Sequence, residues 1–241
     1  AKLWFDREQE KGRLLDKQVK ISLMRELAWQ IWHEEKRAIY FQDLLRLVKE
    51  LKGRKTLDFG DEAEDDIAEE MRTASFLKRD DDGNYSFADT SFEEYFLACK
   101  VYECLKRPAG PPSIRTLLRT RLFSRKVIFF LEKLISEDGV TYAAFQQILQ
   151  GDYETQVSEN ALQILYWSER IRCGMEQEIT DHEKLRQTLG KCIPKGVQLA
   201  NARLKEIVLE GADLSEADFT GADQTEEEVA ERARMTLHRA R

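Results

Sequence analysis

A large hydrophobic residue recurs every five positions near the C-terminus, and no other feature restricts the fold so strongly. These large positions are Leu199, Leu204, Leu209, Leu214 and Phe219. Two residues before each of them, and once more after the last, stands a small or β-branched residue: Val197, Ala202, Ile207, Ala212, Ala217 and Ala222. A period of five fits neither an α-helix nor a β-strand. It fits a four-sided β-solenoid over residues 196–223, in which each edge turns one large and one small side chain inward.

A helix is expected to follow this solenoid, over residues 225–241. Gln224 places a polar side chain at the next large position, which ends the repeat. Thr225 and Glu228 have the spacing of a capping box. One apolar stripe then continues along the segment: Val229, Ala233, Leu237 and Ala240. A helix lying over an open solenoid end shields its core from water, so we expect a capping role.

The N-terminal half predicts a domain made of helices and one β-hairpin. Residues 1–20 are expected to form an N-terminal helical segment. Apolar side chains then recur with helical spacing in three stretches, and two short alternating runs come after them. The expected helices lie within 21–35, 41–53 and 61–73, and the expected strands lie within 75–79 and 85–89. Three helices followed by a hairpin is the order of a winged helix, so we expect a winged-helix-like domain over residues 21–107.

The joint between the two alternating runs has two interpretations. Asp82-Gly83 is a typical hairpin step. Asp80, Asp82 and Asn84 also match the first, third and fifth positions of a calcium-binding loop. Such a loop needs a glycine at its sixth position and a glutamate at its twelfth, where this chain has tyrosine and serine. We therefore predict a hairpin tip and no calcium site.

Residues 113–190 are expected to form an α-helical array. A proline-rich break at 107–112 separates it from the preceding domain. The expected helices are 113–137, 141–150, 157–172 and 181–190. Together with the segments described above, they give a mainly α chain that ends in a short, capped β-solenoid.

Basic residues collect around the start of this array. Between residues 106 and 130 the chain has seven lysines and arginines and no acid. The four that we select as a candidate basic contact patch are Arg115, Arg119, Arg125 and Lys126. Such a patch could contact phosphates or nucleic acid. We favour a solvated helix face, or one that docks on the acidic helix 61–73, because the patch is short and the protein is acidic overall.

Composition excludes several classes of protein. The chain has 241 residues with a formal net charge of -7, and 34% of its residues are charged. The sequence has no apolar run long enough to cross a membrane and no apolar core of a signal peptide. We therefore expect a cytoplasmic protein without a membrane partner. The first residue is not Met, which favours a piece of a longer chain over a processed one.

No catalytic or metal-binding pattern stands out, so we expect no enzyme and no metal. Phosphate-binding glycine loops of the GxxxxGK[ST] and GxGxxG types are missing, and so is a GxSxG nucleophile elbow. The cysteines and histidines are too scattered for a zinc site or a disulfide scaffold. They are Cys99, Cys104, Cys173 and Cys192, with His33, His182 and His238.

Two stretches resemble the C-terminal part of NACHT-type STAND NTPases. Phe76–Phe87 followed by Thr90–Ala98 is similar to the winged-helix end of that family, whose pattern is Phe-x-His-x-Ser-Phe-x-Glu-Tyr-Phe. The helix containing LMRELAWQIW is also similar to a helical segment of the family. Residues 196–223 resemble pentapeptide repeats, a frequent C-terminal array in such proteins. The helices of 113–190 match only loosely.

This resemblance implies a regulatory role. In the family, the winged helix packs on a nucleotide-binding domain and holds the closed state. The matching positions that would face that domain are Asp89, Ser91, Phe92, Glu94 and Tyr95. The family's phosphate-contacting histidine aligns with Asp89, whose charge would repel phosphate.

The resemblance also implies the cofactors and partners. ADP or ATP would bind only to a missing N-terminal NACHT domain, so no cofactor is expected in this chain. The expected partners are that domain of the same full-length protein, and a protein ligand or a further copy of the chain.

We therefore expect a non-catalytic sensor segment of a STAND signalling NTPase, acting through protein contacts and conformational switching, with prokaryotic defence as a setting. One alternative is a winged-helix module that binds nucleic acid. It would place helix 61–73, with seven acidic residues, against the phosphates. Another alternative is an acidic pentapeptide-repeat mimic of DNA, but little more than one solenoid coil is too short to imitate a duplex.

Overall fold

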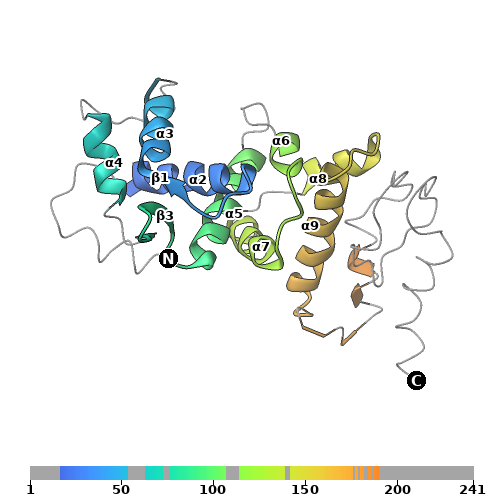
Figure 1. The fold of residues 1–241 in the computed structure, drawn as a ribbon. Coiled ribbons are helices and arrows are strands. Elements are labelled where there is room, and N and C mark those ends of the chain that lie inside the picture. Colours follow the sequence, from blue (N-terminus) through green and yellow to red (C-terminus); the bar gives the residue numbers. More distant parts are fainter. Residues whose placement is uncertain are drawn as a thin grey trace. The chain divides into compact units, whose positions relative to one another are not determined.

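The computed structural model is mainly helical and divides into two compact units (Figure 1). The units are residues 1–100 and 101–241, and their boundary falls inside helix α5 (Thr90–Lys106). The expected solenoid 196–223 and helix 225–241 lie outside the described residues, as does most of the segment 1–20. The structure describes residues 17–53, 63–72, 76–106, 114–138, 142–175 and part of 177–189.

The helices predicted within 21–35, 41–53 and 61–73 are present, and so is the predicted hairpin. An additional two-residue strand lies between the first two helices. The elements are α2 (Lys17–His33), β1 (Ile39–Tyr40), α3 (Phe41–Gly53), α4 (Glu64–Arg72), β2 (Leu77–Arg79) and β3 (Asn84–Phe87), followed by the start of α5.

The three strands form one antiparallel sheet in the order β1-β3-β2. In the hairpin, Leu77 pairs with Phe87 and Arg79 pairs with Tyr85. On the other side of β3, Ile39 of β1 pairs with Tyr85. Sequence analysis missed β1 because two residues are too few to show an alternating pattern. The strand ties the start of α3 to the hairpin.

The core of the first unit lies where α3 meets α2 and α4 and where α4 meets β2. Helical spacing places its aliphatic side chains on the inner faces of these helices. The hairpin adds aromatic side chains, because Phe76 meets both Phe92 and Phe96 edge to face, with ring centroids 5.0 and 5.5 Å apart. The largest fully buried side chains of this unit are Leu23, Met24, Leu27, Ile31, Ile39, Leu44, Ile67, Met71, Phe96 and Leu97.

The second unit is built around α9 (Val157–Arg172). This helix packs against α6 (Ile114–Leu118), α7 (Arg125–Asp138) and α8 (Ala143–Gln150). Every residue of α9 from Val157 to Ile171 is buried, including seven polar or charged ones. Sequence periodicity correctly predicts α8 and α9. The expected helix 181–190 is described only in part.

The expectation of one continuous helix over 113–137 is wrong. Residues 119–124 separate α6 from α7. Ser124 begins α7, since its Oγ accepts a hydrogen bond from the Val127 amide at 3.2 Å. The side chain that holds this separating segment belongs to another helix: it is the fully buried side chain of Asn160 in α9. A contact with α9 therefore determines where α6 ends, and periodicity within residues 113–137 cannot reveal it.

Candidate functional site

The first candidate site is the start of α5, where Asp89 acts as the helix cap. One carboxylate oxygen accepts a hydrogen bond from the Ser91 amide at 2.7 Å. The Asp89 carbonyl also accepts a hydrogen bond from the Phe92 amide at 3.0 Å. Aspartate is a favoured cap because its oxygen satisfies a backbone N–H that has no partner within the helix. Asp89 thus has a local role at the position where the resembling family has histidine.

The other four candidates at this helix end lie on its half-buried side. Phe92 turns toward the hairpin and contacts Phe76. Tyr95 lies beside Phe96, with ring centroids 5.5 Å apart. Ser91 and Glu94 are half-buried as well. Phe92 therefore helps to join α5 to the hairpin, whereas the contact of Tyr95 with Phe96 lies within α5.

The second candidate, the hairpin tip, has the geometry of a tight turn. Asp80 accepts hydrogen bonds from the amide of Asn84 at 2.8 Å and from its side-chain Nδ2 at 3.0 Å. These hydrogen bonds from Asn84 lower the pKa of Asp80 below its ordinary value. Gly83 has a φ of 86°. The carboxylate is used to close the turn, which agrees with the predicted hairpin tip.

We expect the substitution Gly83→Ala to destabilise this hairpin. A side chain at positive φ costs about 1–2 kcal/mol, and the new Cβ would lie 3.2 Å from Arg79 Nη2. Gly53→Ala is the matched control, because nothing lies within 4 Å of a Cβ there. Urea denaturation of both variants measures the difference. Equal stabilities would contradict the assigned turn geometry.

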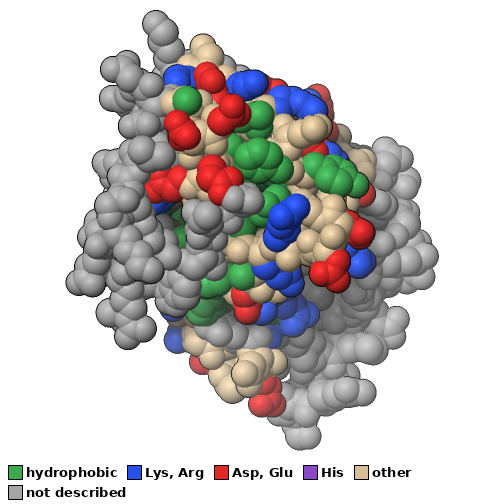
Figure 2. Space-filling model, turned by 60° about the vertical axis from the view of Figure 1, so that its left-hand side comes forward, with side chains coloured by type: hydrophobic (Ala, Val, Ile, Leu, Met, Phe, Trp, Pro, Cys, Tyr) green, Lys and Arg blue, Asp and Glu red, His purple; other side chains and the backbone are tan. Residues whose placement is uncertain are grey.

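The third helix of the first unit, α4, carries an acidic outer face. Its first turn contains Glu64, Asp65 and Asp66, and a helix N-terminus favours negative charge. Glu70 forms an ion pair with Lys20. Asp65, Asp66 and Glu69 are exposed. On the face shown in Figure 2, acidic and basic side chains are interspersed with hydrophobic ones.

The structure places the four basic candidates in two different environments. Arg115 and Arg119 both contact Glu154, with N–O distances of 3.2 and 2.5 Å. The hydrogen bond to Arg119 is the largest cause of the lowered pKa of Glu154. Arg125 instead stacks on a tryptophan ring of α9, and Lys126 is exposed. Arg115, Arg119 and Arg125 therefore all contact other residues of the unit that contains them.

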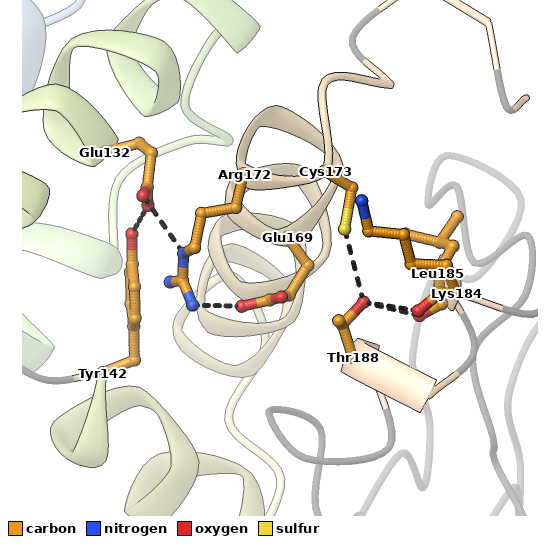
Figure 3. Close-up of polar contacts among 8 residues, drawn as sticks. All are labelled: Glu132, Tyr142, Glu169, Arg172, Cys173, Lys184, Leu185 and Thr188. Atoms are coloured by element: carbon orange, nitrogen blue, oxygen red, sulfur yellow. Dashed lines mark hydrogen bonds and ion pairs between the residues drawn. The ribbon is translucent and has the colours of Figure 1, made fainter. Parts of the chain in front are cut away.

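A buried polar network that sequence analysis missed joins α7, the start of α8 and α9 (Figure 3). Glu132 accepts hydrogen bonds from the Tyr142 hydroxyl and from Arg172 Nε, the latter at 3.1 Å. Arg172 also reaches Glu169 at 2.5 Å. Its guanidinium carbon lies 4.8 Å from the Tyr142 ring centroid. One guanidinium thus bridges two carboxylates, both of which are 4% exposed.

The network predicts a loss of stability at alkaline pH. Burial raises the pKa of Tyr142 above its ordinary 10.0, and the hydrogen bond to Glu132 raises it further. The neutral phenol therefore stabilises the fold fully below that ordinary value, and this contribution is lost as the pH rises above it. Tyr142→Phe should reduce stability by about 1 kcal/mol at neutral pH. Denaturation across the pH range should show a shallower alkaline decline in the variant; parallel curves would contradict this.

The functional residues that the sequence did not predict belong to no recognisable sequence pattern. Asn160 is one polar residue in a helix, and Glu132 and Arg172 are 40 positions apart. Asp89 was recognisable, because an aspartate directly before a helix is a typical cap. Because Asp89 aligns with the family's phosphate-contacting histidine, it was interpreted as a position facing phosphate rather than as a helix cap.

The described residues contain no group of three or more His, Cys, Asp or Glu side chains that could hold a metal ion. Within that same part of the chain, no helix is long and apolar enough to cross a bilayer. Cys99 and Cys104 are buried free thiols.

Comparison with known proteins identifies the C-terminal repeat. The family model described as "Pentapeptide repeats (8 copies)" matches residues 195–223. This match confirms the predicted five-residue repeat over its whole predicted extent, residues 196–223. No curated protein and no solved structure matches the chain.

Proposed function

We propose that this chain is a non-catalytic regulatory segment that acts through protein contacts. In this proposal, residues 21–107 form a winged-helix-like domain, and the pentapeptide repeats form a capped solenoid that senses a ligand. The observed order α2-β1-α3-α4-β2-β3, with a sheet ordered β1-β3-β2, supports the winged-helix part. The resemblance to NACHT-type STAND NTPases supplies the expected partner, a nucleotide-binding domain preceding this chain.

The observation that carries the proposal is the charge on α4. In a DNA-binding winged helix, the third helix lies in the major groove and must tolerate phosphates on both sides. Here that helix exposes Asp65, Asp66 and Glu69. Three carboxylates at this position would repel DNA, whereas a protein partner can match them with basic side chains. Protein contact is therefore favoured over nucleic-acid binding.

The test is a binding series with the purified chain. The probes are labelled ADP, labelled ATP, a labelled generic DNA duplex, and the separately purified protein segment encoded directly upstream. We expect binding to the upstream segment and no binding to the duplex. The ADP and ATP probes measure separately whether this chain itself contacts a nucleotide. Duplex binding that weakens as salt rises would overturn the proposal, and so would failure to bind the upstream segment.

A double charge-reversal variant tests directly whether the acidic residues of α4 prevent DNA binding. Asp65→Lys with Asp66→Lys changes two exposed side chains of α4, so the fold should persist. This double variant should gain salt-sensitive duplex binding that the parent chain lacks. The control is Glu137→Lys with Asp152→Lys, which makes the same change of charge at exposed sites of the second unit. Equal gains in both variants would show that net charge, rather than α4, excludes DNA.

A further inference from the structure

Two arginines from different helices stack on the indole ring of Trp167. The guanidinium carbons of Arg125 and Arg170 lie 4.0 and 4.6 Å from the ring centroid. Trp167 is buried, and its Nε1 donates a hydrogen bond to Gln163 Oε1 at 3.2 Å, which holds the ring in place. Arg125 stands exposed in the first turn of α7, and Arg170 is 6% exposed in the last turn of α9.

Both guanidinium groups keep hydrogen-bond donors without acceptors among the described residues. Arg170 uses only its Nε, which donates to the Met175 carbonyl at 3.0 Å. Arg125 has ring contact with Trp167 and neither a hydrogen bond nor an ion pair within that part of the chain. An arginine that is nine-tenths buried without a carboxylate is unusual, because removing its charge from water is costly.

Other arginines of the same unit do have acidic partners. Arg172, two positions after Arg170, bridges Glu132 and Glu169. Arg115 and Arg119 share another glutamate. The pair on Trp167 therefore differs from its neighbours in lacking an anion.

The electrostatics of α7 point to the same conclusion. The N-terminus of a helix carries partial positive charge and favours acidic side chains. The first turn of α7 contains no acid and begins instead with Arg125 and Lys126. Like charges at this end are unfavourable, and a bound anion would neutralise them.

We propose that Arg125 and Arg170 bind one phosphate-class oxyanion beside Trp167. The planar donor fork of a guanidinium matches the oxygens of phosphate, and two such forks match its double negative charge. Arg170 is held in place by Trp167 and by its hydrogen bond to the Met175 carbonyl, and the exposed Arg125 stacks on the same ring. The site goes beyond the proposed regulatory function and does not depend on it.

The experiment is calorimetric titration of the full chain with inorganic phosphate at constant ionic strength, with chloride as the reference anion. A second titration uses ATP. Binding of phosphate alone would identify a free anion as ligand, and binding of ATP at least about tenfold tighter would identify a phosphate ester. Absence of saturable binding of both would overturn the proposal.

Variants decide whether the two arginines form the site. Arg125→Gln removes an exposed charge and should weaken phosphate binding about tenfold or more. Arg170→Lys keeps the buried charge but loses the fork and should weaken binding as well. The matched control is Arg121→Gln, an exposed arginine of the same unit, which should bind like the parent chain. Equal weakening by Arg121→Gln would indicate general charge attraction and overturn the site, as would unchanged binding by Arg125→Gln.

Discussion

Asn160→Ala should destabilise the second unit by about 3–5 kcal/mol, because three hydrogen bonds, two of them buried and one part-buried, are lost together. The side-chain Nδ2 of Asn160 donates to the carbonyls of Leu118 and Arg121 at 2.9 and 2.8 Å. Its Oδ1 accepts from the Phe123 amide at 2.9 Å. Asn160 is fully buried, so these backbone groups would lose their partner away from water. The higher helix propensity of alanine offsets only about 0.5 kcal/mol.

Two measurements check this expectation. Chemical denaturation followed by tryptophan fluorescence gives the loss of stability, and amide hydrogen exchange should become faster at Phe123 in particular. Gln147→Ala is the control, since it removes an exposed amide from the neighbouring helix α8. A loss below about 1 kcal/mol in Asn160→Ala would show that the segment between α6 and α7 does not depend on α9.

Arg172→Met should cost about 3 kcal/mol at neutral pH, because two buried carboxylates lose their shared cation. Glu132 and Glu169 are both buried. The Arg172 side chain is 41% exposed, so water screens part of the attraction and the effect should stay below that of a fully buried pair.

A second substitution separates charge from packing in this network. Adding Glu132→Gln to Arg172→Met removes one of the two facing charges and should restore part of the stability. Arg46→Met is the control, because Arg46 is 66% exposed and pairs with Asp43 at 3.2 Å. That control should cost less than about 1 kcal/mol. Equal losses in Arg46→Met and Arg172→Met, measured by urea denaturation, would contradict the assigned role of burial.

Local patterns predicted most elements of the described fold. Apolar side chains at helical spacing identified α2, α3, α8 and α9, and the Asp-Gly step identified the hairpin. Each of these signals lies within one element, where the period of the backbone determines which side chains share a face. The five-residue repeat is local in the same sense, and its match to a family model confirms it.

The candidate sites were less predictable than the elements. The basic patch was a correct observation of sequence, but its members have different surroundings. Arg115 and Arg119 pair with Glu154, which is more than 30 positions away. Arg125 meets Trp167, which is farther still along the chain. A run of charged residues in the sequence shows which side chains could form ion pairs. It does not show their partners, because the packing of the helices determines which residues meet.

The sequence by itself determined the helix faces, the hairpin turn and the pentapeptide repeat, since each depends on neighbours within a few residues. Only the tertiary structure decided where α6 ends, because Asn160 of α9 supplies the hydrogen bonds that the backbone of residues 118–123 needs. It also decided that Arg172 pairs with two glutamates, while Arg170 has donors that meet no acceptor among the residues that the structure describes. A buried polar group needs a hydrogen-bond partner, and the packing of the helices decides which residue supplies it. The position of that partner along the chain cannot be predicted from the periodicity of a single element.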